Sequence, residues 1–300
     1  MAQVLCYLRG TRILMPVETR PVEALRIGDA VVTRFAGVQR IKWIGRQSYD
    51  PRFLQRNPDK MPVCIKAGAL GDATPARDLY VSPGHSLLLE SRLVLASALV
   101  NGVTITQSMA GLAGQIDYFQ IELEAHDCVL AEGAWAESFA DAPGLRAQFH
   151  HQAEFWARYP DYVTPDALAL CAPRPERGPA LGVALREVVA LAGRGLGAGW
   201  LDGALDLVSS DLIEGWAMDV SHPDLPVMLD IWDGDVRLDS VLACDARADL
   251  RAAGKGRGYC AFSYRPALPL RAEVLKNLRV TRAGGAAELR RGTACRGIAA

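Results

Sequence analysis

The sequence predicts a mostly β protein built from two domains with a short helical linker between them. Short runs of β-branched and aromatic residues, separated by Gly and Pro turns, recur in both end regions. Between these regions, apolar residues recur at helical spacing. We therefore expect an all-β domain over residues 1–140, a helical linker over 141–198 and a small β-sandwich over 199–292.

The first domain is predicted to consist of many short strands. A turn at Gly28-Asp29 precedes a β-branched run that ends at Thr33, and Gly45 is expected to end the next strand. Further strands are predicted over residues 40–43, 62–66, 79–81, 118–123 and 128–131. Strands this short, with turn signals between them, are typical of an all-β fold.

The linker is predicted to hold two helices. The first runs from Gly144 to Tyr159, where Pro160 ends it, and the second covers Leu181–Leu191. Three prolines between residues 168 and 179 indicate an irregular segment that separates the helices.

Strand patterns return after residue 199. They cover residues 204–208, 212–218, 226–232, 236–245, 258–264 and 274–281, with a hairpin turn at Asp233-Gly234. This number of strands in about 90 residues is typical of a small β-sandwich. Residues after Gly292 are expected to fray.

Composition excludes several functions. Lys and Arg number 33 against 34 Asp and Glu, which argues against a nucleic-acid partner. The seven cysteines form no CxxC pair, so we expect neither a disulfide scaffold nor a metal site, and no cofactor. The sequence carries no signal-peptide pattern and no apolar run long enough for a transmembrane helix. The default expectation is a cytoplasmic protein, with unconventional or C-terminal export signals left open.

The N-terminal region contains a dense motif. A cysteine is followed by a Gly-Thr turn, a proline turn, a Pro-Val-Glu segment and a Gly-Asp turn. Twelve positions share one register: Cys6, Gly10, Thr11, Ile13, Pro16, Pro21, Val22, Glu23, Leu25, Gly28, Asp29 and Val31. Two further blocks follow in order, Val81-Ser82-Pro83-Gly84-His85 and His126–Gly133. The three blocks resemble the Hint family, the fold shared by hedgehog autoprocessing domains and inteins, and in particular its bacterial branch.

This resemblance implies a Hint-type domain that cleaves its own chain. Cys6 would attack the carbonyl of Leu5 in an N–S acyl shift, and an external thiol, hydroxyl or water would resolve the thioester. His85 would protonate the leaving amine, and Ser82 would hydrogen-bond the scissile peptide. His126 would be a second acid or base. Thr11 and Asp127 would support the site, Asp127 by orienting His126.

The chain also departs from the intein pattern. Glu137 and Ser138 stand where inteins carry His and Asn, so we expect cleavage rather than full splicing. Only Met1–Leu5 precede Cys6 in the printed sequence, and processing would release these five residues unless the chain extends upstream.

Two other interpretations stay open. The first is a retired Hint scaffold that acts as an interaction or surface-associated protein. The second is a Cys–His hydrolase of other molecules, which lacks a recognisable oxyanion motif. The C-terminal region resembles accessory modules of glycan-related and surface-related proteins, which leaves a glycan or protein partner open. There, Trp232 is interpreted as a core residue.

Overall fold

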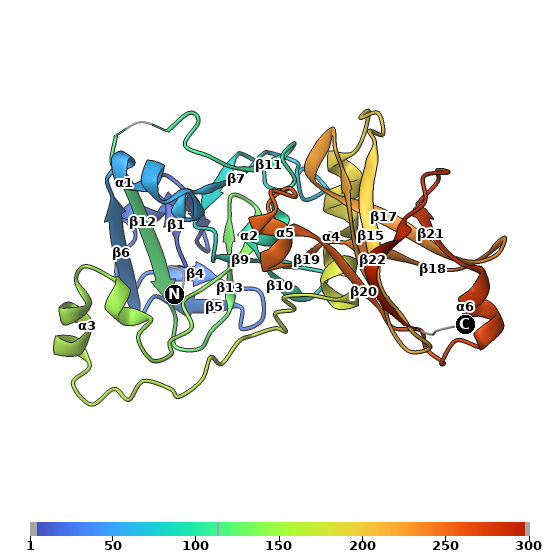
Figure 1. The fold of residues 1–300 in the computed structure, drawn as a ribbon. Coiled ribbons are helices and arrows are strands. Elements are labelled where there is room, and N and C mark those ends of the chain that lie inside the picture. Colours follow the sequence, from blue (N-terminus) through green and yellow to red (C-terminus); the bar gives the residue numbers. More distant parts are fainter. Residues whose placement is uncertain (1–4, 113, 298–300) are drawn as a thin grey trace. The chain divides into compact units, whose positions relative to one another are not determined.

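The computed structural model describes residues 5–112 and 114–297, which form two compact units. One unit holds the residues up to Val100 together with Thr104–Arg174, and the other holds Asn101–Val103 and the residues from Pro175 on. Strands dominate both units (Figure 1), so the predicted mostly β class is confirmed. The boundary after Arg174 falls inside the segment that the sequence analysis treats as a linker.

The first unit is made of short strands in three sheets. The first sheet has the order β11-β7-β8-β1-β12-β6. Its strands are β1 (Tyr7–Leu8), β6 (Trp43–Tyr49), β7 (Val63–Ile65), β8 (Leu79–Val81), β11 (Ile105–Gln107) and β12 (Ile116–Glu122). The second has the order β10-β9-β14-β13-β2-β3. Its strands are β2 (Arg12–Leu14), β3 (Thr19–Pro21), β9 (Ser86–Leu89), β10 (Arg92–Leu95), β13 (Cys128–Ala131) and β14 (Ala134–Glu137). The third pairs β4 (Ala30–Val32) with β5 (Val38–Arg40).

Helices are few and short in this unit. They are α1 (Pro51–Arg56), α2 (Ala96–Leu99) and α3 (Gln152–Arg158), with 3₁₀ turns at Val22–Ala24, Pro58–Lys60 and Arg146–Gln148. The single helix predicted from Gly144 to Tyr159 is therefore wrong: extended backbone at Phe149 separates the 3₁₀ turn from α3.

Phe149 also explains a second difference from the sequence analysis. Gly45 does not end a strand but lies inside β6, paired with Gln120 of β12. A Cβ atom at Gly45 would lie 2.6 Å from the Phe149 ring. The glycine thus keeps the strand intact and leaves room for an aromatic ring, which packs edge-on against Trp43.

Two strand pairings position the candidate site residues. β1 lies between β8 and β12, which places Cys6 at the entrance of a central strand beside the turn that follows β8. The β13–β14 hairpin pairs Cys128 with Glu137, and its tight turn has Glu132 and Gly133 in the left-handed region.

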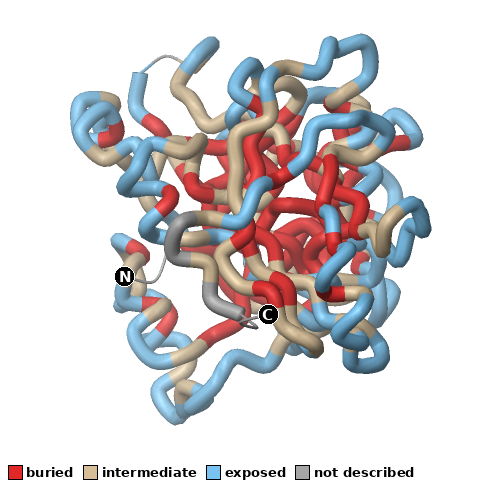
Figure 2. Tube along the Cα trace, turned by 45° about the vertical axis from the view of Figure 1, so that its right-hand side comes forward, coloured by how far each residue is buried: buried red, intermediate tan, exposed pale blue. Residues whose placement is uncertain are grey.

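Figure 2 shows that buried segments, in red, are enclosed by exposed loops.

The second unit is a curled β-sheet. Its main order is β18-β17-β16-β15-β22, while β20 pairs with β16 and β19, and β21 pairs with β17. The strands are β15 (Leu201–Val208), β16 (Ile213–Asp219), β17 (His222–Asp233), β18 (Val236–Ala243), β19 (Asp245–Ala246), β20 (Tyr259–Tyr264), β21 (Leu278–Arg282) and β22 (Arg290–Gly297). The helices are α4 (Pro179–Ala192), α5 (Ala248–Ala252) and α6 (Ala272–Asn277).

Strand β17 is long enough to pair with three strands: its first part pairs with β16, and its remainder pairs with β18 and β21. One apolar core, with Leu229 and Phe262 among its members, fills the curl. The hairpin at Asp233-Gly234 and the helix at 181–191 are confirmed. Fraying directly after Gly292 is wrong, since β22 continues to Gly297 alongside β15. No helix within residues 5–112 and 114–297 is long and apolar enough to span a membrane.

Candidate functional site

Cys6 and Ser82 are joined by two hydrogen bonds. The backbone N–H of Cys6 donates to Ser82 Oγ at 2.8 Å, and the N–H of Ser82 donates to the Cys6 carbonyl at 2.9 Å. The N–H of Cys6 belongs to the Leu5–Cys6 peptide. The contact that the sequence analysis expects between Ser82 and this peptide is therefore present. Burial raises the pKa of the Cys6 thiol well above its usual range, so the sulfur carries its proton at neutral pH.

His85 lies in the same cluster on the turn between β8 and β9. Its backbone N–H donates to the Ser82 carbonyl at 3.0 Å, and its ring packs 4.3 Å from the ring of Tyr7. The ring is fully buried, and neither ring nitrogen has a hydrogen-bond partner among the described residues. Burial lowers the pKa of His85 to about 4, so this imidazole is neutral at physiological pH.

His126 has the opposite electrostatic setting. Its Nδ1 accepts a hydrogen bond from the backbone N–H of Cys171 at 2.9 Å, and its Nε2 lies 3.6 Å from Glu137 Oε2. Burial lowers the pKa of His126, while its side-chain contacts with Cys171 and Glu137 raise it above the usual value. Because Nδ1 accepts a hydrogen bond, the ring proton lies on Nε2, the nitrogen that faces Glu137.

Glu137 is the site residue that the sequence analysis did not identify. Its side chain has no exposed surface, and it accepts a hydrogen bond from the N–H of Ser86 at 2.6 Å on one oxygen. Its other oxygen is paired with Arg174 and faces His126. Burial opposes ionisation, yet hydrogen bonding from His126 and the positive charge of Arg174 hold the pKa of Glu137 below its usual range. The only sequence signal was its position where inteins carry a histidine.

The two supporting residues lie outside this cluster of ionised groups. Thr11 Oγ1 donates to the carbonyl of Leu8 at 2.7 Å and so stabilises the turn after β1. The carboxylate of Asp127 accepts hydrogen bonds from the backbone N–H groups of Phe35 and Ala36. Asp127 therefore anchors the loop between β4 and β5, and the carboxylate that faces His126 is that of Glu137.

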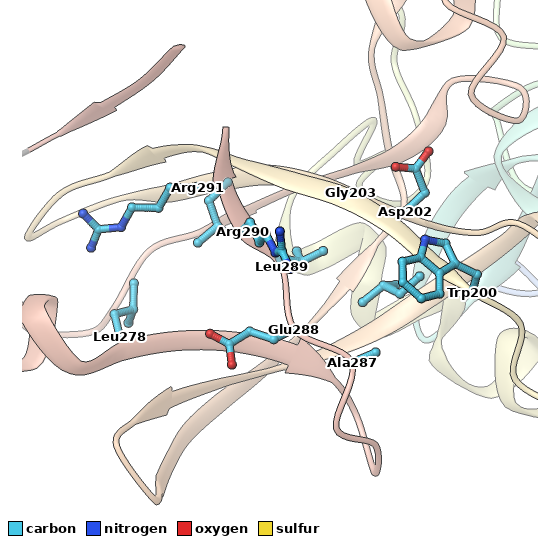
Figure 3. Close-up of a pocket in the computed structure, with 11 residues that line it drawn as sticks. Trp200, Asp202, Gly203, Leu278, Ala287, Glu288, Leu289, Arg290 and Arg291 are labelled. Carbon is cyan, nitrogen blue, oxygen red and sulfur yellow. The ribbon is translucent and has the colours of Figure 1, made fainter. Parts of the chain in front are cut away.

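The second unit contains a separate hollow of about 860 Å³. Figure 3 shows the Trp200 indole at one end and Leu278 and Arg291 toward the other, with Glu288 and Arg290 between them. Trp200 is 78% exposed, while its carbonyl accepts a hydrogen bond from the Val220 N–H at 2.9 Å. Trp232, by contrast, is partly buried and donates from Nε1 to Thr281 Oγ1 at 2.9 Å.

Comparison with known proteins agrees with the motif blocks. A family model described as "Hint domain" matches residues 5–143, and over this stretch the chain is a Hint domain. Two crystal structures of the MchDnaB-1 intein, one of them of a variant, are structurally similar with 9% sequence identity and a TM-score of 0.31. The alignments cover 44% and 45% of this chain and 99% of each intein. No curated protein matches the chain.

The buried neutral His85 makes stability depend on pH. Because its pKa falls to about 4 on folding, its contribution is full above the unfolded value near 6.5 and is lost as the pH falls toward about 4. We expect the loss of unfolding free energy between pH 7 and pH 4 to be about 3 kcal/mol smaller in His85→Gln than in wild type.

Urea unfolding of both proteins at each pH measures this difference. The control His150→Gln removes an exposed histidine from the same unit and should leave most of the pH dependence unchanged. Parallel pH profiles for wild type and His85→Gln would contradict a buried neutral ring.

The Glu137 charge should be essential for stability. Glu137→Gln removes the acceptor charge but leaves Arg174 in place, so the variant should lose about 3–5 kcal/mol of unfolding free energy. The control Glu124→Gln alters a side chain that is 86% exposed and should cost less than about 0.5 kcal/mol. Chemical denaturation at pH 7 compares the two, and equal small losses would argue against the buried ion pair.

Proposed function

We propose that the Hint domain cleaves its own chain between Leu5 and Cys6. The observation that carries the proposal is the hydrogen bond from the Cys6 N–H to Ser82 Oγ, because it engages the very amide whose bond would break. In this step the Cys6 sulfur bonds to the Leu5 carbonyl carbon and the C–N bond breaks. The thiol proton ends on the new amine, and the acyl group is held as a thioester.

The proton transfer requires a base, because the buried Cys6 thiol is protonated at neutral pH. His85 is neutral and its ring nitrogens are not engaged with other described residues, so it can accept the thiol proton. Once charged, an imidazole with so low a pKa is a strong acid and returns the proton readily to the leaving nitrogen. Ser82 holds the peptide N–H in place during this exchange.

His126 suits the second stage, in which the thioester is resolved. Its Nε2 proton faces the Glu137 carboxylate, which raises the pKa of the ring and so makes it the better base of the two histidines for activating a nucleophile. Water is the simplest nucleophile: it adds to the thioester carbonyl, the C–S bond breaks, and the products are a Leu5 carboxylate and the Cys6 thiol. An external thiol or hydroxyl would act in the same manner.

A retired Hint scaffold is the second candidate function. One observation favours it: Glu137 and Ser138 occupy the end of β14 as fully buried residues, hydrogen-bonded to the backbone N–H groups of Ser86 and Asp127. Both side chains thus have structural partners in a place where inteins carry reactive groups.

For the second unit we propose a binding role, with a sugar ring as the ligand class. An exposed indole fixed at the end of a polar hollow offers a flat apolar face, and Glu288 and Arg290 offer hydrogen-bonding groups. A protein partner that inserts a planar side chain is the alternative occupant.

The cleavage proposal is tested with a small reporter domain fused before Met1, with all native residues retained. Intact-mass measurement should detect release of the reporter through Leu5, faster with added thiol or hydroxylamine. Cys6→Ala should abolish release because no other group can form the thioester, and His85→Ala should slow it by at least about a hundredfold.

The matched control is Cys64→Ala, which removes another buried cysteine of the same unit. It should cleave at the wild-type rate. Reporter that stays attached at every pH between about 6 and 9, where His and Cys titrate, would reject cleavage and favour the scaffold.

Binding by the second unit is tested with a panel of oligosaccharides and isothermal titration calorimetry. Trp200→Ala should lose at least about tenfold in affinity, because stacking on an aromatic ring contributes on the order of 1 kcal/mol or more. The control Trp156→Ala removes a partly exposed indole of the first unit and should bind as wild type does. Equal affinities of Trp200→Ala and wild type would exclude the hollow as the site.

A further inference from the structure

Two cysteines outside the proposed acyl transfer lie next to each other beside His126. The Sγ atoms of Cys128 and Cys171 are 3.8 Å apart, and both thiols are free. Cys128 begins β13, while Cys171 belongs to the irregular, proline-containing segment between α3 and α4. The proposed cleavage uses neither sulfur.

Cys171 begins a short stretch that we call the strap, residues 171–174. It has three anchors on the rest of the first unit. The Cys171 N–H donates to His126 Nδ1, the Pro173 carbonyl accepts from the Leu93 N–H at 2.8 Å, and Arg174 pairs with Glu137. With the strap in place, the side chains of His126 and Glu137 are 4% and 0% exposed. A nucleophile from solvent therefore needs the strap to move before it can approach His126.

The geometry of the cysteine pair is close to that of a disulfide. The sulfurs must approach from 3.8 Å to the bond length of about 2.05 Å. Cys128 is fixed by strand pairing opposite Glu137. Cys171 lies on backbone without regular strand or helix, so strand pairing does not hold it at a fixed distance from Cys128.

The two thiols also differ in reactivity. Cys171 is partly exposed, whereas Cys128 is buried. Hydrogen bonding to Cys128 lowers the pKa of Cys171, burial opposes this, and the neighbouring His126 lowers it further. The same hydrogen bond, together with burial, raises the pKa of Cys128. Cys171 is thus the thiolate that an oxidant meets first, and Cys128 is the proton-bearing partner that can resolve it.

We propose that Cys128 and Cys171 are a redox modification site at which a hydroperoxide forms a disulfide that fastens the strap. With hydrogen peroxide, the Cys171 sulfur takes one oxygen and one water leaves, giving a sulfenic acid. The Cys128 sulfur then bonds to the Cys171 sulfur and displaces a second water. Two thiols are oxidised, one peroxide is reduced to two waters, and a thiol reductant reverses the change.

The regulatory consequence rests on the proposed cleavage. A fastened strap keeps His126 covered, so it would block the resolving step that we assign to His126. Reporter release should therefore slow after oxidation and recover when a thiol reductant cleaves the disulfide.

The disulfide itself is tested on the full chain independently of cleavage. The protein is treated with hydrogen peroxide, remaining thiols are alkylated, and a non-reducing tryptic digest is analysed by mass spectrometry. We expect one cross-linked peptide pair that contains Cys128 and Cys171 and disappears with dithiothreitol. Cys171→Ala and Cys128→Ala should each lack it, and the control Cys64→Ala should retain it. Over-oxidation of Cys171 without a link to Cys128 would overturn the proposal.

The regulatory step is tested with the reporter fusion under the same treatments. Release that slows with peroxide in wild type and in Cys64→Ala, but not in Cys171→Ala, supports the lock. If the cross-linked protein releases the reporter as fast as the thiol-reduced protein does, the lock is overturned. If the reduced protein releases no reporter at all, the cleavage proposal fails, while the peptide map still decides whether the modification site exists.

Discussion

The first unit depends on the burial of one negative charge. The Glu137 carboxylate has no contact with solvent, and an ionised group in such a position costs several kcal/mol unless it is compensated. Compensation comes from the Ser86 N–H at the start of β9, from the ring of His126 before β13, and from Arg174 of the strap. Segments far apart in the sequence must therefore converge on the end of β14, and this convergence fixes the surroundings of both histidines.

The same buried carboxylate contributes to the difference in pKa between the two histidines. His85 is buried beside Tyr7 without a hydrogen-bond partner among the described residues, and its pKa falls to about 4. His126 is held by Glu137 and Cys171, and these contacts raise its pKa. The two imidazoles of one unit therefore differ in basicity. Pairs of titratable groups driven apart in this way are a common means of assigning acid and base roles.

The strap contains both a residue that stabilises the buried Glu137 charge and a residue that contacts His126. Arg174 compensates Glu137, and three residues earlier Cys171 meets both His126 and Cys128. Movement of the strap would expose His126 and would also leave the Glu137 carboxylate without the positive charge of Arg174. The closed arrangement is therefore favoured electrostatically before any covalent link forms, and a disulfide would add to a preference that already exists.

Several strands, the hairpin at Asp233-Gly234 and the Hint domain could be predicted from the sequence, because turn residues and β-branched runs act locally and the motif blocks occur in a fixed order. The sequence also indicated that Ser82 meets the Cys6 peptide. Only the tertiary structure decided what depends on distant partners. Gly45 remains in a strand because the Phe149 ring fills the space of its missing side chain. The role of a buried carboxylate depends on the hydrogen-bond donors around it, and these donors come from remote segments of the chain. For this reason Asp127 binds the backbone of a loop, whereas Glu137 lies at the centre of the site.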